Sequence, residues 1–188
     1  MKKYSFLSGI ALLGLFTLTC VPGAAAQSRR NLYKAFLTAD GVTTNDFGRL
    51  TGVFASNRDI IRRCANDSGM TNANNLTLVY DWDADALEVV NRVTGELLCS
   101  PIAFSGGLSL TNANGTTVER LAFIYLEGNG EAVGTLKGTE RFRYDNDGNV
   151  IRFGFTARLQ FASTGEGARS KIYSAFLSIG PRFVPSRY

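Results

Sequence analysis

The stretch ERFRYDNDGNVIRFGF, Glu140–Phe155, decides the fold, because it holds two alternating segments around a turn. The dipeptide Asp147-Gly148 is typical of a two-residue type I′ hairpin turn. With the turn there, apolar residues oppose apolar ones and polar residues oppose polar ones along both strands, and a shift of one residue would destroy this match. The sequence therefore predicts a long antiparallel hairpin. Its apolar pairs include Phe142 with Phe153 and Tyr144 with Ile151.

The rest of the chain has the pattern of short strands and turns, with one helix. Ser56 as N-cap, with Asp59 three residues on, begins an apolar helical pattern, which predicts a helix at about 57–65. About 8–10 strands without a linker indicate one all-β domain, either an antiparallel β-barrel or a β-sandwich. Pro181 and Pro185 should end the last strand. The expected strands are Leu32–Thr38, Phe47–Phe54, Leu76–Trp82, Ala86–Arg92, Glu96–Phe104, Leu108–Thr111, Thr117–Glu127, Ala132–Asp145, Val150–Ala162 and Arg169–Gly180.

The first residues have the layout of a secretory signal peptide. Lys2 and Lys3 precede a short apolar run, which is followed by small residues up to Ala26. We expect a signal peptide at 1–26 and a single secreted domain at 27–188. A retained anchor is the alternative, but the run is shorter than the ~20 residues of a membrane-spanning helix. The expected location is periplasmic or extracellular, with no transmembrane helix in the mature chain.

Composition excludes several kinds of function. The chain contains no histidine, which excludes Ser-His-Asp and Cys-His catalysis and histidine metal sites. The net charge of +4 falls to +2 without the two leader lysines. The sequence has no long Lys/Arg run, so we do not expect nucleic acid as a partner. Cys64 and Cys99 form a lone pair in the expected exported chain, which predicts one disulfide. We expect no catalytic residue and no cofactor.

Two acidic segments, Asp81–Asp85 and Asp145–Asn149, begin like calcium-binding loops. Neither has the glycine position and closing glutamate that a helix-flanked calcium loop requires. We interpret both segments as turns and expect no metal site.

The polar face of the hairpin places like charges opposite one another. In the predicted register Arg143 opposes Arg152, and Lys137 opposes Arg158. Each such pairing costs up to about 1 kcal/mol. Acids on a neighbouring strand or water would relieve this cost, and the cations would then form a solvated face. The alternative is that these four cations bind an anionic ligand, a polysaccharide or a lipid head group.

Glu140 lies on the apolar face of the same hairpin, opposite Phe155. Gly134 and Gly138 leave that face without side chains nearby, and such glycines often mark bends in a strand. If Glu140 points into a cavity, burial would raise its pKa, and it would anchor a ligand or act as a general acid. Otherwise it pairs with an internal arginine or lies at the margin of the sheet.

Three functions follow from these patterns. The preferred one is an exported, non-catalytic β domain that binds a ligand or serves a structural role in a bacterial envelope. The second is a small outer-membrane β-barrel, because strands of this length with one apolar and one polar face suit such a barrel. The third is an enzyme that acts on glycans with Glu140 and a second carboxylate.

Overall fold

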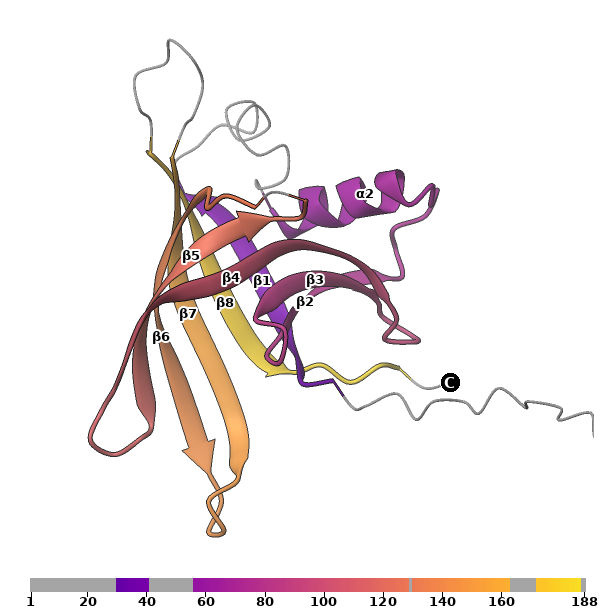
Figure 1. The fold of residues 1–188 in the computed structure, drawn as a ribbon. Helices are drawn as coiled ribbons and strands as arrows, with labels where there is room; N and C mark the ends of the chain where they lie inside the picture. Colours follow the sequence, from indigo (N-terminus) through magenta and orange to yellow (C-terminus); the bar gives the residue numbers. More distant parts are fainter. Residues whose placement is uncertain (1–29, 41–55, 129, 163–171, 187–188) are drawn as a thin grey trace, which may run out of the picture.

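The computed structural model describes residues 30–40, 56–128, 130–162 and 172–186. Within these ranges eight strands form a closed antiparallel barrel, in which each strand pairs with its neighbours in sequence and β1 pairs with β8 (Figure 1). This confirms the predicted all-β fold. Of the two predicted architectures, the structure shows the barrel and not the sandwich. The elements are β1 Leu32–Asp40, α2 Asn57–Asp67, β2 Leu76–Asp81, β3 Ala86–Asn91, β4 Leu97–Thr111, β5 Thr117–Leu126, β6 Gly134–Tyr144, β7 Val150–Ala162 and β8 Ile172–Arg182.

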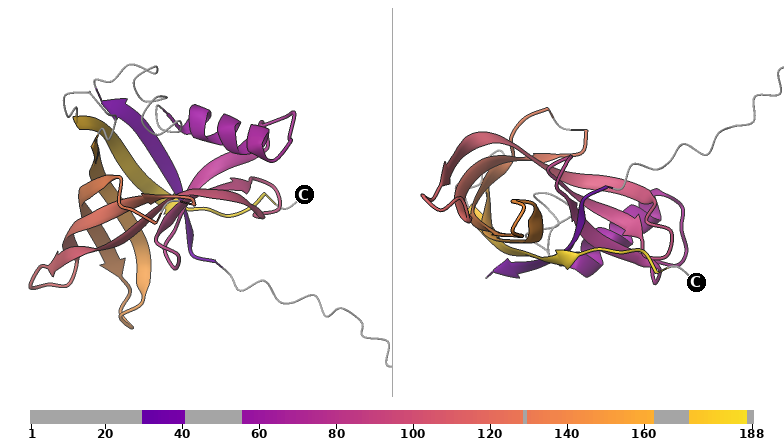
Figure 2. Two further views of the ribbon diagram at one scale, coloured as in Figure 1. Left: turned by 45° about the horizontal axis from the view of Figure 1, so that its top comes forward. Right: turned by 90° about the horizontal axis from the view of Figure 1, so that it is seen from below.

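The predicted helix is present and packs on the barrel beside β2, β3 and β4 (Figures 1 and 2). Its N-terminus is capped as expected, because the Ser56 hydroxyl accepts a hydrogen bond from the Asp59 amide and donates one to the Asp59 carboxylate. Ile60 and Cys64 are buried in the same cluster as the interior of the barrel. The disulfide from Cys64 to Cys99 of β4 is also confirmed, so the helix is covalently joined to the wall.

The β6–β7 hairpin has the predicted register from Gly134–Phe161 to Arg143–Arg152. Phe142 and Phe153 share the inner face, with ring centroids 5.3 Å apart. The predicted turn was wrong, however, because only Gly148 has a positive φ and a type I′ turn requires two such residues. Asp145 pairs with Asn149 around a three-residue loop, and Tyr144 therefore opposes Val150 instead of Ile151.

The interior of the barrel is filled by side chains from all eight strands. Leu136, Leu159 and Phe155 are almost fully buried. A Cβ added to Gly138 would lie 2.6 Å from the Phe155 ring and 2.5 Å from the Ala157 Cβ. The side chains of β7 thus occupy the space that this glycine leaves, and the Gly134–Glu140 side of the hairpin faces a packed core.

The structure corrects the sequence prediction at β4 and β8. The two strands expected between Glu96 and Thr111 are one strand, β4, with a bulge between Ser105 and Leu108. β8 continues through Pro181, where its pairing with β1 is shifted, and a bulge is one of the places where a strand tolerates proline. The strand predicted at Phe47–Phe54 lies outside the described residues. No helix in the described part of the chain is long and apolar enough to cross a membrane.

The chain end after β8 covers a second, smaller apolar cluster on the outside of the barrel. Phe183 is buried there against Leu32, Val79 and Val90. The Phe183 amide donates a hydrogen bond to the Leu32 carbonyl, which holds the tail beside β1. One part of the outer wall is therefore covered, and the remainder of the wall carries the exposed side chains discussed below.

Candidate functional site

Glu140 points into the barrel and binds Arg120 of β5. The Arg120 Nη1 lies 3.2 Å from a Glu140 oxygen and 3.0 Å from an oxygen of Asp85, and Nη2 contacts the second Asp85 oxygen. The Tyr80 hydroxyl donates a hydrogen bond of 2.8 Å to Asp85. This internal network joins β2, β5, β6 and the turn between β2 and β3. The sequence left several interpretations of Glu140 open. The structure shows that Glu140 pairs with an internal arginine.

The internal network is only partly open to solvent and carries more acid than base. The side chains of Arg120, Asp85 and Glu140 are 12%, 29% and 14% exposed. Burial raises the pKa of Glu140, and the charge of Arg120 offsets only part of this shift. Burial lowers the pKa of Arg120, but its hydrogen bonds and charge contacts with Asp85 outweigh that effect and raise it. Protonation of Glu140 would leave one cation and one anion in the network.

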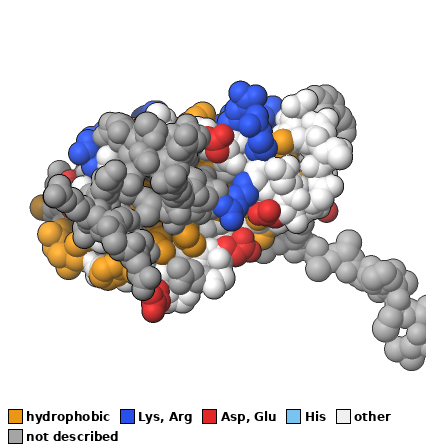
Figure 3. Space-filling model, turned by 90° about the horizontal axis from the view of Figure 1, so that it is seen from above, with side chains coloured by type: hydrophobic (Ala, Val, Ile, Leu, Met, Phe, Trp, Pro, Cys, Tyr) orange, Lys and Arg blue, Asp and Glu red, His pale blue; other side chains and the backbone are white. Residues whose placement is uncertain are grey.

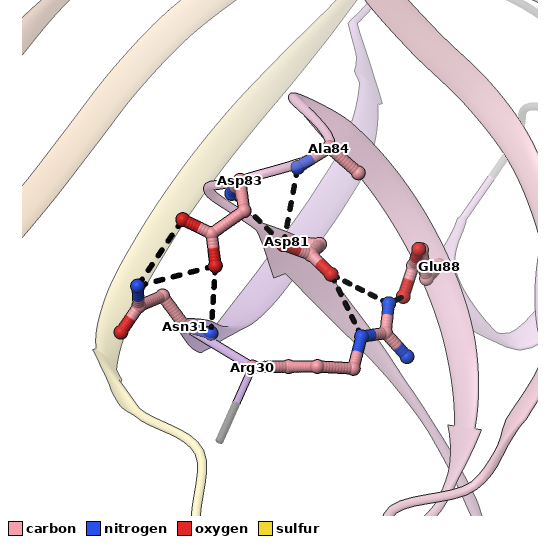
Figure 4. Close-up of polar contacts among 6 residues, drawn as sticks. All are labelled: Arg30, Asn31, Asp81, Asp83, Ala84 and Glu88. Atoms are coloured by element: carbon pink, nitrogen blue, oxygen red, sulfur yellow. Dashed lines mark hydrogen bonds and ion pairs between the residues drawn. The ribbon is translucent and has the colours of Figure 1, made fainter. Parts of the chain in front are cut away.

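A second arginine holds the other end of the β2–β3 turn, on the outer side of the barrel (Figure 4). The Arg30 Nε lies 2.9 Å from the Asp81 carboxylate, and its Nη2 contacts both Asp81 and Glu88. The second oxygen of Asp81 accepts hydrogen bonds from the amides of Asp83 and Ala84. Burial raises the pKa of Glu88, with Arg30 partly offsetting the shift. The outer network thus also has one arginine between two carboxylates.

The acids of the β2–β3 turn are therefore engaged in ion pairs and turn hydrogen bonds. Asp81 binds Arg30, and Asp85 binds Arg120 and Tyr80. In the described ranges, no group of three or more His, Cys, Asp or Glu side chains is placed to hold a metal ion. In the second acidic segment, the Asp145 carboxylate accepts hydrogen bonds from the amides of Asp147 and Asn149, as turn residues do.

The four predicted cations lie on the outer wall of the barrel. Arg143 directly opposes Arg152, and Lys137 directly opposes Arg158, as the sequence predicts. All four side chains are exposed, and Arg141 is exposed on the same wall. Lys137, Arg143 and Arg152 form no ion pair within the described part of the chain. We call these five cations of β6 and β7 the basic wall.

A shallow groove of ≈ 290 Å³ crosses the basic wall over β5 to β8. It is lined by charged, hydroxyl and aromatic side chains. Glu119 is the acid in the groove, and it accepts a hydrogen bond of 3.1 Å from the Thr139 hydroxyl. The groove therefore combines a cation pair, hydroxyl donors and an aromatic ring. Its lining includes Glu119, Lys137, Thr139, Thr156, Arg158 and Phe176.

The residues predicted as one binding set thus fall into two separate places. Glu140 lies inside the barrel, whereas Lys137, Arg143, Arg152 and Arg158 lie outside, on the opposite face of the same two strands. Residues alternate between the faces of a strand, so Glu140 and its neighbour Arg141 point in opposite directions. No single ligand in the groove can contact both sets.

The sequence reasoning missed the partners of both networks. Arg120 carries a signal, because it follows the alternation of Ala122 and Ile124, which are buried. A charged residue on the apolar side of a strand indicates a buried partner. Arg30 carries no comparable signal, because it precedes the first strand and its acidic partners are about fifty residues away.

A comparison of the chain with protein-family models, with curated proteins and with solved structures found no match. Fold and site therefore define only a structural class. Its members would be closed eight-stranded antiparallel barrels with a packed interior, a disulfide-linked helix and a basic outer wall.

The Glu140→Gln variant should gain stability relative to the wild type as the pH rises. Because the pKa of Glu140 is raised above its ordinary value of 4.5 in the folded protein, its contribution to stability is fully present below that value and is lost as the pH rises through the folded pKa. Glutamine cannot undergo this loss. Urea unfolding between about pH 4.5 and pH 8 measures the difference, with Glu127→Gln on the surface as the control for losing one negative charge. A difference that does not change with pH would contradict the prediction.

Proposed function

We propose that this protein is an exported, non-catalytic barrel that binds an anionic ligand of the cell envelope on its basic wall. The observation that supports this most directly is that Arg143 opposes Arg152 and Lys137 opposes Arg158 on adjacent strands. Like charges directly opposite on neighbouring strands destabilise a sheet by up to about 1 kcal/mol per pair. Lys137, Arg143 and Arg152 form no ion pair with an acid in the described part of the chain. A bound anion would reduce the repulsion between the opposed cations.

Two features support export. The leader has the layout of a signal peptide, and disulfides persist in oxidising compartments outside the cytosol. The Cys64–Cys99 bridge joins the helix to the barrel and is part of the folded structure.

The distribution of side chains favours this proposal over an outer-membrane barrel. A barrel that faces lipid on all sides has an apolar outer band and a polar interior. Here the interior is filled mainly by apolar side chains around one ion-pair network, and the outer wall of β6 and β7 carries five cations. The glycan-acting enzyme is also less favoured, because Glu140 and Asp85 both bind Arg120 and lie away from the groove.

Binding of a soluble sulfated polysaccharide tests the proposal. Removing two of the cations should weaken binding of dextran sulfate about tenfold, since exposed ion pairs contribute roughly 0.2–1 kcal/mol each and 1.4 kcal/mol is a factor of ten. Binding should also weaken with salt. The variants are K137Q/R158Q and R143Q/R152Q, and the matched control is R58Q/R62Q, which removes two exposed cations from α2.

Titration of the mature chain with dextran sulfate and with neutral dextran at low and high salt provides the measurement. Equal weakening by the α2 control, or binding of neutral dextran with the same affinity, would reject the basic wall as the binding site.

A further inference from the structure

The outer wall next to the basic wall is apolar at four exposed positions of β4 and β5. These side chains are Leu108, Leu110, Leu121 and Phe123, which are 57%, 61%, 46% and 44% exposed. Leu108 and Leu121 are directly opposed partners, so the residues are contiguous. We call this set the leucine patch. Contiguous exposed apolar patches often mark interaction sites. Hydrophobic side chains also gather on the left side of the face of the molecule seen in Figure 3.

A bulge in β4 turns the leucine patch outward. Before the bulge, Ile102 and Phe104 point into the core. Gly106 and Gly107 then lie opposite the single residue Ala122, and this extra residue reverses the side on which the following residues lie. Gly107 has φ +86, and a Cβ there would lie 1.9 Å from the Leu121 carbonyl oxygen, so only glycine fits. In a regular strand without the bulge, alternation from the buried Phe104 would direct Leu108 inward.

The segment that carries the leucine patch projects from the barrel. All residues of β4 from Ser105 to Thr111 are exposed, including those on its other face. The end of the β4–β5 hairpin extends beyond the β2–β3 turn in two views (Figures 1 and 2). The hairpin therefore presents the leucine patch at the surface of the barrel, where it can contact another surface.

The pairing places the leucine patch directly beside the cations of the groove. Leu121 opposes Lys137, Lys137 opposes Arg158, and Arg158 opposes Phe176. One row across the wall thus has apolar residues, then two cations, then an exposed aromatic ring. Apolar side chains that enter the acyl boundary, flanked by cations at the level of the head groups, are the arrangement that binds anionic membrane interfaces.

We propose that the leucine patch and the adjacent Lys137 and Arg158 dock the protein on the surface of an anionic phospholipid bilayer. The patch enters the interface, and the two cations contact head-group phosphates. This inference rests on the proposed function and specifies its ligand as an anionic lipid surface. The charge of the wall favours a bilayer over a second copy of the chain, because two basic walls brought together would repel each other.

Vesicle binding tests the inference, with vesicles of equimolar phosphatidylglycerol and phosphatidylcholine and vesicles of phosphatidylcholine alone. The wild type should bind the anionic vesicles and keep part of this binding at high salt, where binding of dextran sulfate is lost. Replacing three residues of the patch should weaken vesicle binding about tenfold, because interfacial binding scales with the apolar area inserted. The same variant should keep its affinity for dextran sulfate. The variant is L108Q/L121Q/F123Q, and the control is L97Q/V184Q, which replaces exposed apolar residues elsewhere.

The outcomes separate the two proposals. If the wild type binds dextran sulfate but no vesicles, or if the triple variant binds vesicles as well as the wild type, the lipid inference is wrong while the proposed function stands. If the wild type binds neither probe, both are wrong. Loss of self-association in the triple variant with unchanged vesicle binding would assign the patch to a second copy of the chain. Salt-resistant binding of the wild type provides a second readout if the triple variant does not fold.

Discussion

Replacing Arg120 with methionine should lower the free energy of unfolding at neutral pH by about 3 kcal/mol. Removing one partner of a buried ion pair leaves the other charge uncompensated, which typically costs about 3–5 kcal/mol. Here two carboxylates, Asp85 and Glu140, lose their only cation within the described residues. The partial exposure of Asp85 places the expected effect at the lower end of that range.

Urea unfolding at pH 7 measures this loss, and it should shrink as the pH falls and the two carboxylates take up protons. Adding Asp85→Asn and Glu140→Gln to the Arg120→Met chain should restore part of the stability. The matched control is Arg152→Met on the exposed wall, where a change of less than about 0.5 kcal/mol is expected. Equal effects of the two arginine replacements would show that the internal network does not stabilise the barrel.

Removing the disulfide should lower the free energy of unfolding by roughly 3–4 kcal/mol on the chain-entropy model. Cys64 and Cys99 are separated by 35 residues, and the loop that they close contains the C-terminal end of α2 and the β2–β3 hairpin. In its absence the helix is held by the burial of Ile60 and Ala65 and by the hydrogen bonds of Asn57 with the backbone of β1. The Cys64→Ser/Cys99→Ser variant tests this by denaturant unfolding.

Chemically reduced wild type should have the same stability as the double serine variant. Hydrogen exchange should show the largest loss of protection in α2, because the bridge is its covalent link to β4. An unchanged unfolding midpoint in both samples would show that noncovalent packing is sufficient to hold the helix.

Several features follow from short-range patterns in the sequence. The register of the β6–β7 hairpin follows from alternation, since only one register puts Phe142 and Phe153 on one face. The helix follows from the Ser56 cap and the helical spacing after it. The predicted two-residue turn was wrong. The Asp145 carboxylate accepts hydrogen bonds from the amides of Asp147 and Asn149, and Gly148 has a left-handed conformation; together these favour a three-residue loop.

The candidate site could be predicted only in part. The opposed cations were predictable because they belong to adjacent strands joined by one turn. The groove between them was not, since it also needs Phe176 of β8 and Glu119 of β5. The leucine patch was not predictable either, because the bulge at Gly106 and Gly107 reverses an alternation that otherwise directs those leucines inward.

By itself the sequence determined the hairpin register, the capped helix and the cysteine pair, because each depends on residue spacing or on residues a turn apart. Only the tertiary structure decided that β1 closes on β8, that Arg120 lies between Asp85 and Glu140, and that the basic wall lies beside the leucine patch. The physical reason is that alternation specifies which residues share a face of one strand. Which strands become neighbours, and which faces turn inward, depends on closing the whole barrel around its core.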